Sequence, residues 1–529
     1  MRSVFPKVRL LLVLFCAGLL LAIGTPPFSF PLAPLVGVTV LAAVLLREVP
    51  NAKTPQRTIR RGFGLGFVFG VGINIAALRF VPAVIVRFTP LSLPLGVLAL
   101  VLVSLAQGLA FGVLGGAFAA LLRLGVKAPV AFGMAMFAST YTPAVFPWTI
   151  VTGLTPFPLA TQTADLVGER GVAANWAFIC ALVAYAHHTK DKRAAIGALA
   201  SALVVFGYGA VRLAAFPVTD GSVKVGLVSQ AVEPKERWIT SFASTITSRL
   251  HELTRNTERE GATLTVWPEA AYPYATPRGT TSDVWGERSI LGPGIRGPVL
   301  TGIILRHPPK VLGPDDPGGS TNSAVLVTYD KLQGVGQFSE PSDKIHLLAF
   351  GEHVPFTTVF PQLRRIFFRG GKGLVPGARN ILQTSGDIRA GMLNCFEDTL
   401  SDAGRGALVD GKTGKEANLL INVTNDSWFK DSMESPLHEQ MARLRAVELR
   451  RDLVRAVNYG PLSHIDAAGR VRARRYVSEP TFLVVSPTLR DGMTIFARVG
   501  DLPMAIAFLA LFVFRVFAIR TRAKGIARA

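Results

Sequence analysis

The feature that most constrains the fold is the uneven distribution of apolar residues along the chain. Long apolar runs fill the first 216 residues and return once at 501–519, whereas the stretch between them has mixed polarity. Half of the 529 residues are hydrophobic, which is typical of an integral membrane protein. We therefore expect a membrane domain over 1–216, a domain with its own core over 217–499, and a last membrane helix with a basic tail over 500–529.

A helix needs about 20 apolar residues to cross the hydrocarbon core of a bilayer. On this criterion the sequence predicts eight transmembrane helices, near 8–24, 30–46, 62–80, 94–120, 128–150, 172–187, 194–216 and 501–519. The first run has the basic start of a signal peptide, but it lacks a convincing cleavage site and a second apolar run follows closely. We therefore expect the first run to be a helix.

The formal net charge of +21 is compatible with nucleic-acid binding, because Lys and Arg neutralise phosphates. No nucleic-acid motif accompanies the charge, however, and many basic residues flank apolar runs, so we expect no nucleic-acid partner. With a cytoplasmic N-terminus, the positive-inside bias places the basic segments 47–61, 188–193 and 520–529 in the cytoplasm. The 217–499 domain then lies outside the cytoplasm.

Short apolar runs bounded by Gly, Pro or charged residues indicate strands in the 217–499 domain. The expected strands are 223–229, 263–267, 299–306, 323–329, 388–394 and 418–423. Helical patterns occupy 239–260 and 436–456, the second beginning at Pro436 and carrying an apolar stripe that includes Leu453. Strands interleaved with helices predict an α/β architecture in which helices cover buried sheets.

Cys395 is the one cysteine of the 217–499 domain. The other two, Cys16 and Cys180, lie inside apolar runs, where cysteine usually behaves as a small hydrophobic residue. Without a partner in its own domain, Cys395 cannot form an internal disulfide there, and outside the cytoplasm a free thiol is open to oxidation. We expect such a thiol to be retained for chemistry rather than for packing.

Two further residues suit chemistry with this thiol. Glu269 follows the expected strand TLTVW, Lys344 lies in SDKIHLLAFGEHVPF, and Cys395 ends the expected strand IRAGMLN. Strand ends are where α/β folds usually assemble their sites. A carboxylate can take the thiol proton, and an ammonium can stabilise both the thiolate and an oxyanion. Taken singly, each residue also suits a structural role: a loop carboxylate, a surface lysine or a packed cysteine.

The motifs WPEAAYP, K-x-H-L-x-x-F-G-E-x-V-P and N-C-F-E-D, followed by NDSWF, resemble those of the nitrilase superfamily. Together with the eight expected spans, the chain resembles the apolipoprotein N-acyltransferase family over nearly its whole length. The resemblance implies an αββα sandwich joined to a membrane-embedded helical base. It also implies a catalytic triad of Glu269, Lys344 and Cys395.

The resemblance further implies a reaction in two steps, with no metal or dissociable cofactor. Cys395 would take an acyl chain from a phospholipid, phosphatidylethanolamine in the family, and the N-terminal amine of a diacylated lipoprotein would then accept it. The implied location is the bacterial inner membrane, with the catalytic domain on the periplasmic side. A membrane-tethered amidase that uses the same triad on a water-soluble amide is the alternative enzyme, and a non-catalytic scaffold, which the intact triad disfavours, is the third class.

Supporting residues also follow from the resemblance. Glu352 of GEHVPF would lie beside the triad, and Glu397 matches a carboxylate two residues after the nucleophile. Trp238 and Trp428 match tryptophans of the active-site region and lipid-binding loops, although packing explains them equally well.

The chain also departs from the family pattern. Phe396 stands where Tyr is usual and Ala349 where Pro is usual, and neither difference alters the triad. Loop 363–373, LRRIFFRGGKG, combines two phenylalanines with basic residues, which suits a lid that inserts Phe367 and Phe368 among acyl chains. A basic surface loop with packed phenylalanines is the alternative.

Overall fold

The structure is a computed structural model, and it describes all residues except 1–4, 51–53, 90, 238, 309–318, 350, 354–361, 363–372 and 527–529. Trp238 and the expected lid, apart from Gly373, therefore lie outside the described residues. The chain forms two compact units. The helical unit comprises Met1–Phe216, Ser432–Leu444 and Thr494–Ala529, and the α/β unit comprises Pro217–Asp431 and Arg445–Met493.

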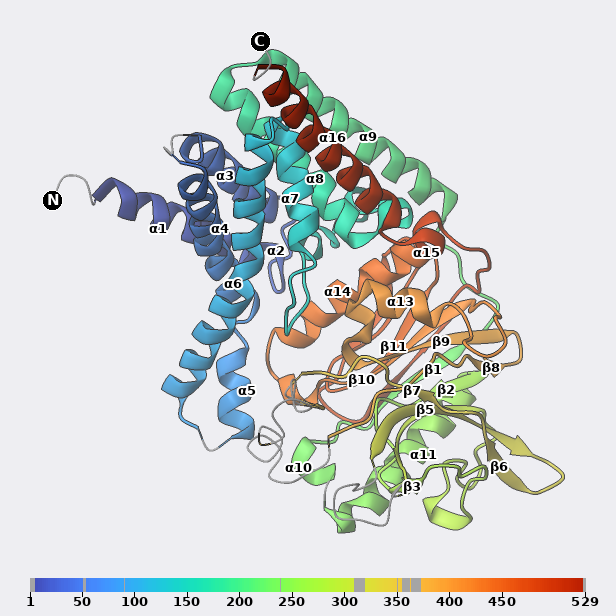
Figure 1. Ribbon diagram of the computed structural model, residues 1–529. Helices are drawn as coiled ribbons and strands as arrows, with labels where there is room; N and C mark the ends of the chain where they lie inside the picture. Colours follow the sequence, from blue (N-terminus) through green and yellow to red (C-terminus); the bar gives the residue numbers. More distant parts are fainter. Residues whose placement is uncertain are drawn as a thin grey trace. The chain divides into compact units, whose positions relative to one another are not determined.

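The helical unit consists of apolar helices joined by short connections (Figure 1). Its helices are α1 (Phe5–Leu19), α2 (Leu21–Gly24), α3 (Leu32–Glu48), α4 (Pro55–Ala77), α5 (Val81–Phe88), α6 (Leu93–Arg123), α7 (Ala128–Ser139), η1 (Ile150–Leu154), η2 (Pro158–Ala160), α8 (Ala164–Thr189), α9 (Lys192–Ala215), α15 (Ile495–Val499) and α16 (Leu502–Ile526).

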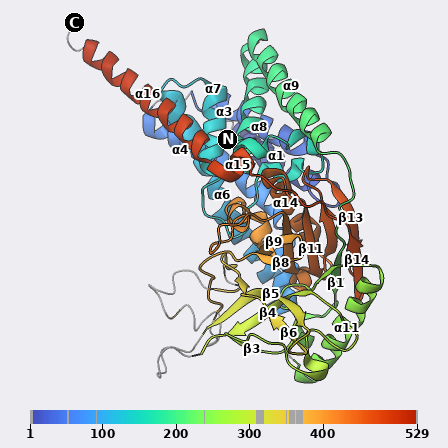
Figure 2. The ribbon, with the colours of Figure 1, turned by 90° about the vertical axis from the view of Figure 1, so that its right-hand side faces the viewer.

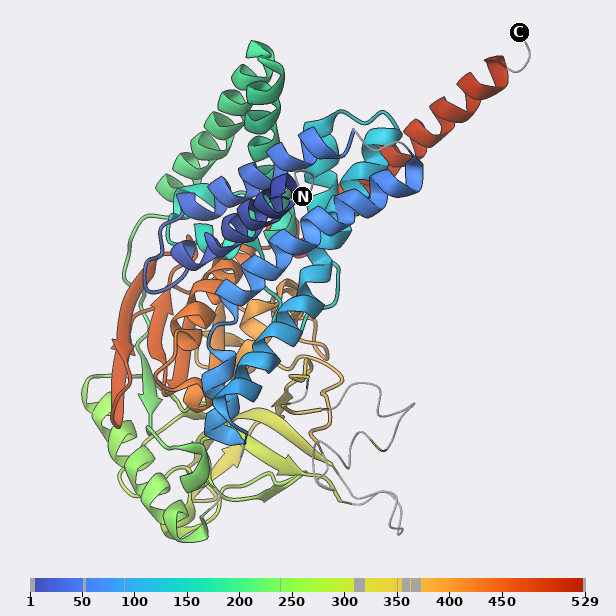
Figure 3. The ribbon, with the colours of Figure 1, turned by 90° about the vertical axis from the view of Figure 1, so that its left-hand side faces the viewer.

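Helices α4 and α6 run side by side, and both are drawn in blue shades in Figure 3. Glycines allow their backbones to touch. A Cβ added at Gly66 of α4 would lie 2.0 Å from the carbonyl oxygen of Phe111 in α6, and one added at Gly115 of α6 would lie 2.0 Å from the carbonyl oxygen of Gly62. Larger residues at these positions would force the two helices apart.

Among the described residues, three helices are long and apolar enough to cross a membrane: Leu93–Arg123, Ala164–Thr189 and Lys192–Ala215. A fourth span results if Pro55–Ala77 and Val81–Arg87, which meet at a bend of 52°, are counted together. Shorter apolar helices cover Val8–Gly24, Ala128–Ser139 and Leu502–Ala518. The figure of eight transmembrane helices therefore stays a prediction.

The run expected to be helical over 128–150 is a shorter helix. Helix α7 ends at Ser139, and the chain continues through turns to η1. Pro143 and Pro147 account for the early end, because proline has no backbone N–H to donate and its ring clashes with the preceding turn.

Helix α16 is held in the helical unit by polar contacts close to its first residue. The Arg170 guanidinium of α8 lies 2.6 Å from a carboxylate oxygen of Asp501, and the Tyr141 hydroxyl donates to the same oxygen at 2.9 Å. The last segment of the chain thus packs with helices from its first half.

The α/β unit contains two sheets. The first follows the order β14-β1-β2-β4-β5-β6, with β3 beside β4 and β7 beside β5; the second follows the order β13-β12-β11-β10-β9-β8. The strands are β1 (Val225–Ser229), β2 (Leu264–Val266), β3 (Thr276–Pro277), β4 (Val299–Arg306), β5 (Ser320–Asp330), β6 (Val335–Phe338), β7 (Ser342–Asp343), β8 (Gln383–Ser385), β9 (Ile388–Asn394), β10 (Leu419–Asn425), β11 (Leu453–Asn458), β12 (Pro461–Ile465), β13 (Val471–Tyr476) and β14 (Thr481–Val485).

The two sheets pack face to face over a shared apolar core, to which one sheet contributes Leu227 and Leu326 and the other Met392 and Ile421. Helix α11 (Ala243–Arg259) covers the outer face of the first sheet, as Figure 2 shows in green. Helix α13 (Ser401–Ala407) packs so closely on β9 that a Cβ added at Gly391 would lie 2.3 Å from the Ala407 carbonyl oxygen. The predicted α/β layer architecture is confirmed.

The expected helix over 436–456 is wrong at its C-terminal end. Helix α14 covers Glu434–Leu449, Arg450 has φ +50°, and Leu453 begins β11. The prediction failed because Leu453 continues the apolar period of the helix, whereas the chain reverses at Arg450 and pairs Leu453–Asn458 in parallel with β10.

We predict that Gly66→Leu destabilises the protein by about 1–3 kcal/mol, the usual cost of overpacking. Gly64 lies on the same helix and has no atom within 4 Å of an added Cβ, so Gly64→Leu is the matched control. Thermal unfolding in detergent measures the effect. Equal melting temperatures for the two variants would contradict this description of the contact between α4 and α6.

Candidate active site

Glu269 is positioned by the turn that follows β2. Ala270 has φ +49°, and Gly302 of β4 lies against this turn: a Cβ there would be 2.4 Å from both the Pro268 carbonyl oxygen and the Ala270 nitrogen. Glu269 is buried, with 6 % of the residue exposed. A buried carboxylate needs partners, because removing a charge from water is costly.

Those partners come from two sides. Glu269 Oε1 accepts from Asn322 Nδ2 at 2.6 Å and from Lys344 Nζ at 3.2 Å, whereas Oε2 accepts the Asn425 backbone N–H at 3.0 Å. Asn322 lies on β5, and Asn425 ends β10 of the other sheet. The carboxylate is therefore fixed by groups from both layers of the sandwich.

Lys344 follows the short strand β7 and is 1 % exposed. Its ammonium donates to Glu352 Oε1 at 2.9 Å as well as to Glu269. Burial acts to lower the pKa of Lys344, but the carboxylates of Glu269 and Glu352 outweigh it and raise the pKa well above its ordinary value. Lys344 is thus a permanent cation between two carboxylates.

Cys395 begins η5 (Cys395–Thr399), directly after β9. It has φ +53°, a left-handed conformation that costs an ordinary residue about 1–2 kcal/mol. The side chain is partly exposed, and the thiol is free. The sharp turn from strand to 3₁₀ helix therefore presents the sulfur at the end of the sheet.

Burial and the Glu269 carboxylate raise the pKa of Cys395 well above its ordinary value, and the Lys344 ammonium partly opposes them. The thiol consequently stays protonated at rest and needs a base in order to react. Electrostatic interaction with both Glu269 and Lys344 means that the structure brings the three predicted triad residues together.

The structure places the two supporting glutamates next to these residues. Glu352 pairs with Lys344 through Oε1, and its Oε2 accepts the Leu348 N–H at 2.8 Å. Glu397 Oε1 accepts the N–H groups of Ile345 and His346, the two residues after Lys344. Its other oxygen, Oε2, accepts the Asn394 N–H at 2.8 Å, so Glu397 joins the lysine segment to the turn that carries Cys395.

Phe396 departs from the usual tyrosine, but its ring contributes to the site. The centroid lies 5.5 Å from Lys344 Nζ, within the range of a cation–π interaction. Trp428 lies in η6 (Asp426–Phe429) after β10 and is 46 % exposed. Its assignment to lipid contact stays a prediction.

Sequence analysis missed Asn322, whose side-chain amide donates to Glu269 and also to Glu352, the latter at 3.3 Å. The available signal was the polar start of β5, where Ser320, Thr321 and Asn322 precede an apolar run. Asn425 was also missed, because it acts through its backbone N–H and that role leaves no mark on residue type.

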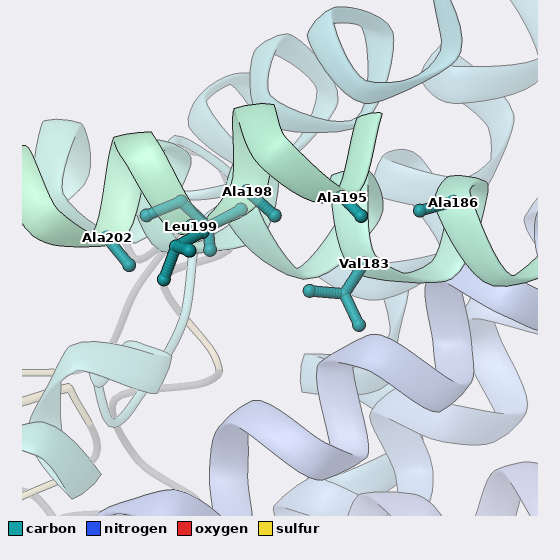
Figure 4. A pocket seen from close by; sticks show the side chains of 7 residues that line it. Val183, Ala186, Ala195, Ala198, Leu199 and Ala202 are labelled. Carbon is teal, nitrogen blue, oxygen red and sulfur yellow. The ribbon is translucent and has the colours of Figure 1, made fainter. Parts of the chain in front are cut away.

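An apolar pocket of about 380 Å³ lies in the helical unit, along α8 and α9 (Figure 4). It is lined by Ile179, Val183, Ala186, Ala195, Ala198, Leu199 and Ala202. None of these side chains can act as a nucleophile, base or ion. The pocket suits hydrocarbon, whereas the reactive groups are those of the α/β unit.

Comparison with known proteins gives matches over both parts of the chain. The model of the apolipoprotein N-acyltransferase N-terminal domain matches residues 17–182, and the carbon-nitrogen hydrolase model matches residues 237–474. The apolipoprotein N-acyltransferase of Allorhizobium ampelinum is 30% identical over 486 residues, covering 88% of this chain and 87% of the relative. The chain belongs to the apolipoprotein N-acyltransferase family.

Other members of the apolipoprotein N-acyltransferase family match over similar lengths. The enzyme of Brucella melitensis is 28% identical and covers 88% of this chain and 87% of its own. That of Geobacter metallireducens is also 28% identical and covers 92% and 90%. Among solved structures, a mutant of the nitrilase-superfamily amidase of Nesterenkonia AN1 covers 53% of this chain and 94% of its own, with 17% identity and a TM-score of 0.33, too low to carry an argument.

We predict that Gly302→Ala lowers acyl-transfer activity about a hundredfold, because the added methyl group displaces the turn that holds Glu269. Gly226→Ala is the matched control: Gly226 lies in the same sheet, on β1, and its added Cβ would lie 2.5 Å from the Thr257 side chain of α11 rather than against the turn that holds Glu269. Initial rates per folded protein are the measurement. A similar loss of rate in both variants would assign the effect to general destabilisation.

Burial raises the pKa of Glu397 to about 7, from an ordinary value of 4.5. Between pH 4.5 and about pH 7, Glu397 is protonated in the folded protein but ionised in the unfolded chain. The stability that this bound proton contributes is therefore fully present below pH 4.5 and is lost as the pH rises through about 7. We predict that Glu397→Gln melts further below wild type at about pH 5 than at about pH 8. An unchanged difference in melting temperature would contradict the raised pKa.

Proposed function

We propose that this chain transfers a fatty acyl chain from a phospholipid, through a thioester on Cys395, to the N-terminal amine of diacylglyceryl-cysteine on apolipoproteins. The observation that carries the proposal is the buried cluster of Glu269, Lys344 and Glu352 beside a thiol held at a strained turn. Membership of the apolipoprotein N-acyltransferase family supports the lipid substrates and the amine acceptor.

In the first step, Glu269 removes the Sγ proton as the sulfur attacks the carbonyl carbon of the sn-1 ester. The carbonyl π electrons move onto oxygen, and Lys344 stabilises both this oxyanion and the thiolate. The tetrahedral intermediate then expels the glycerol oxygen, to which Glu269 returns the proton. Lysophospholipid leaves, and the acyl chain remains on Cys395 as a thioester.

In the second step, the neutral α-amine of the lipoprotein attacks the thioester carbonyl carbon. Glu269 takes a proton from this nitrogen, and Lys344 again stabilises the oxyanion. Collapse breaks the carbon–sulfur bond, the thiolate recovers a proton from Glu269, and the product is an amide. The enzyme returns to its starting state without a redox change or a cofactor.

The supporting residues hold this arrangement in place. Glu352 keeps Lys344 directed at the site, and Glu397 fixes the nucleophile turn against the lysine segment. Trp238 and Trp428 contact lipid in this proposal, which the exposure of Trp428 supports.

The proposed setting is the bacterial inner membrane, which the chain crosses eight times, with the α/β unit on the periplasmic side. The basic segments between apolar runs support this orientation. Phosphatidylethanolamine is the proposed acyl donor, since it is the donor that the family resemblance implies.

A membrane-tethered amidase is the second candidate, and the carbon-nitrogen hydrolase match over residues 237–474 favours it. The same Glu269, Lys344 and Cys395 would serve both reactions. The acceptor distinguishes them: water resolves the thioester in an amidase, and an amine resolves it in the acyltransferase.

We predict that wild-type protein mixed with phospholipid gains one fatty-acyl mass on the peptide that contains Cys395, as measured by mass spectrometry. Cys395→Ala should show no such mass, and Cys180→Ala, which removes a buried cysteine of the helical unit, should be acylated like wild type. Absence of the adduct in folded wild-type protein would contradict the proposal.

Glu269→Gln is predicted to slow formation of the acyl-enzyme about 10²–10⁴-fold, the usual contribution of a general base. Lys344→Met should also slow formation of the acyl-enzyme, because it removes the charge that stabilises the oxyanion. Single-turnover acylation followed by quenching and mass measurement gives the rate. Acylation of Glu269→Gln at the wild-type rate would exclude Glu269 as the base.

A further inference from the structure

Two buried polar side chains that take no part in the mechanism above reach the turn that carries Cys395. They are Asn422 of β10 and Arg455 of β11, which lie opposite each other in register. Ile421 and Val423 point into the core between the sheets, so strand alternation places Asn422 on the outer face of its sheet. Both polar side chains have 0 % exposure.

Asn422 contacts the nucleophile residue directly. Its Nδ2 donates to the carbonyl oxygen of Cys395 at 2.9 Å and to that of Leu393 at 3.2 Å. The Thr424 hydroxyl donates to Asn422 Oδ1, which fixes the orientation of the amide. One side chain therefore holds the backbone on both sides of the bend.

Arg455 contacts the same turn at Asp398, three residues after Cys395. Its Nε donates to Asp398 Oδ2 at 2.9 Å, and Asp398 is also fully buried. A buried ion pair rarely adds net stability, because desolvation of two charges offsets their attraction. A fully buried ion pair that joins this turn to β11 is better explained by the geometry that it imposes on the turn.

The turn needs such support because of its backbone conformation. Cys395 has φ +53°, and a side chain with a Cβ persists there only where its surroundings determine the conformation. A relaxed turn would carry the sulfur away from Glu269 and Lys344.

We propose that Asn422 and the Arg455–Asp398 pair are positioning residues that hold Cys395 in its reactive conformation. The inference rests on the proposed function only in taking Cys395 as the nucleophile. It predicts a slower acylation step with unchanged affinity for the acyl donor.

The test measures acylation of Cys395 in the full-length protein by two donors. One is phospholipid, and the other is p-nitrophenyl butyrate, whose leaving group needs no protonation. Asn422→Leu should lower the acylation rate constant with either donor about tenfold or more, and leave the donor concentration at half-maximal rate unchanged.

Asn418→Leu is the matched control. Asn418 lies next to the same strand, is buried, and donates Nδ2 to the Asp387 carbonyl oxygen at 2.8 Å, but it does not touch the nucleophile turn. The melting temperature of Asn418→Leu should fall as that of Asn422→Leu does, because each loses a buried hydrogen bond. Its acylation rate constant should stay within about twofold of wild type. Equal rate losses in the two variants, or a wild-type rate in Asn422→Leu, would overturn the proposal.

A second comparison, of Asp398→Ala with Asp398→Asn, tests the positioning role if Asn422→Leu does not fold. Asp398→Ala should acylate slowly, and Asp398→Asn should recover most of the rate, since its oxygen can accept from Arg455 Nε. Wild-type rates in both would overturn the positioning role. If wild type reacts with the ester but not with phospholipid, the proposed function fails, while the ester series still tests whether Asn422 and the Arg455–Asp398 pair position Cys395. Failure with both donors overturns both proposals.

Discussion

The site depends on the burial of one ammonium group. Lys344 is almost fully enclosed, and such a charge is tolerated only because Glu269 and Glu352 lie within hydrogen-bonding distance of it. Asn322 donates to the same two carboxylates, so two donors and two acceptors form one compact cluster. Removal of Lys344 would leave these two carboxylates without a cation between them.

This cluster explains why the Cys395 thiol is unreactive at rest although a base and a cation lie next to it. Burial and the neighbouring Glu269 keep Cys395 protonated, which limits oxidation and unproductive attack. In the proposed reaction the carbonyl oxygen of the ester gains negative charge, which the Lys344 ammonium stabilises. The Glu269 carboxylate takes the thiol proton in this reaction. In the proposed mechanism the same cluster serves both acyl-transfer steps, because each step ends with the base and the cation restored.

The sequence was sufficient to single out three residues that the structure brings together: Glu269 and Cys395 each follow an apolar run, and Lys344 lies in a recognisable motif. It was also sufficient for the α/β layers, whose strands are short Val- and Leu-rich segments. It was insufficient where tertiary context decides. Leu453 fits a helix by periodicity but begins a central strand, and Asn425 contributes a backbone N–H that no residue type reveals. Residue type also cannot predict the left-handed conformation of Cys395, whose carbonyl oxygen accepts a hydrogen bond from Asn422, a residue of another strand.

The most direct test of the account concerns the fate of the thioester. Acyl-enzyme is formed on Cys395 with phospholipid, separated from excess donor, and divided between buffer alone and a peptide with an N-terminal diacylglyceryl-cysteine. The account predicts that the acyl mass leaves the protein rapidly with the peptide and appears on the peptide amine as an amide, while it persists in buffer. Release of free fatty acid at the same rate in both portions, with no acylated peptide, would contradict it.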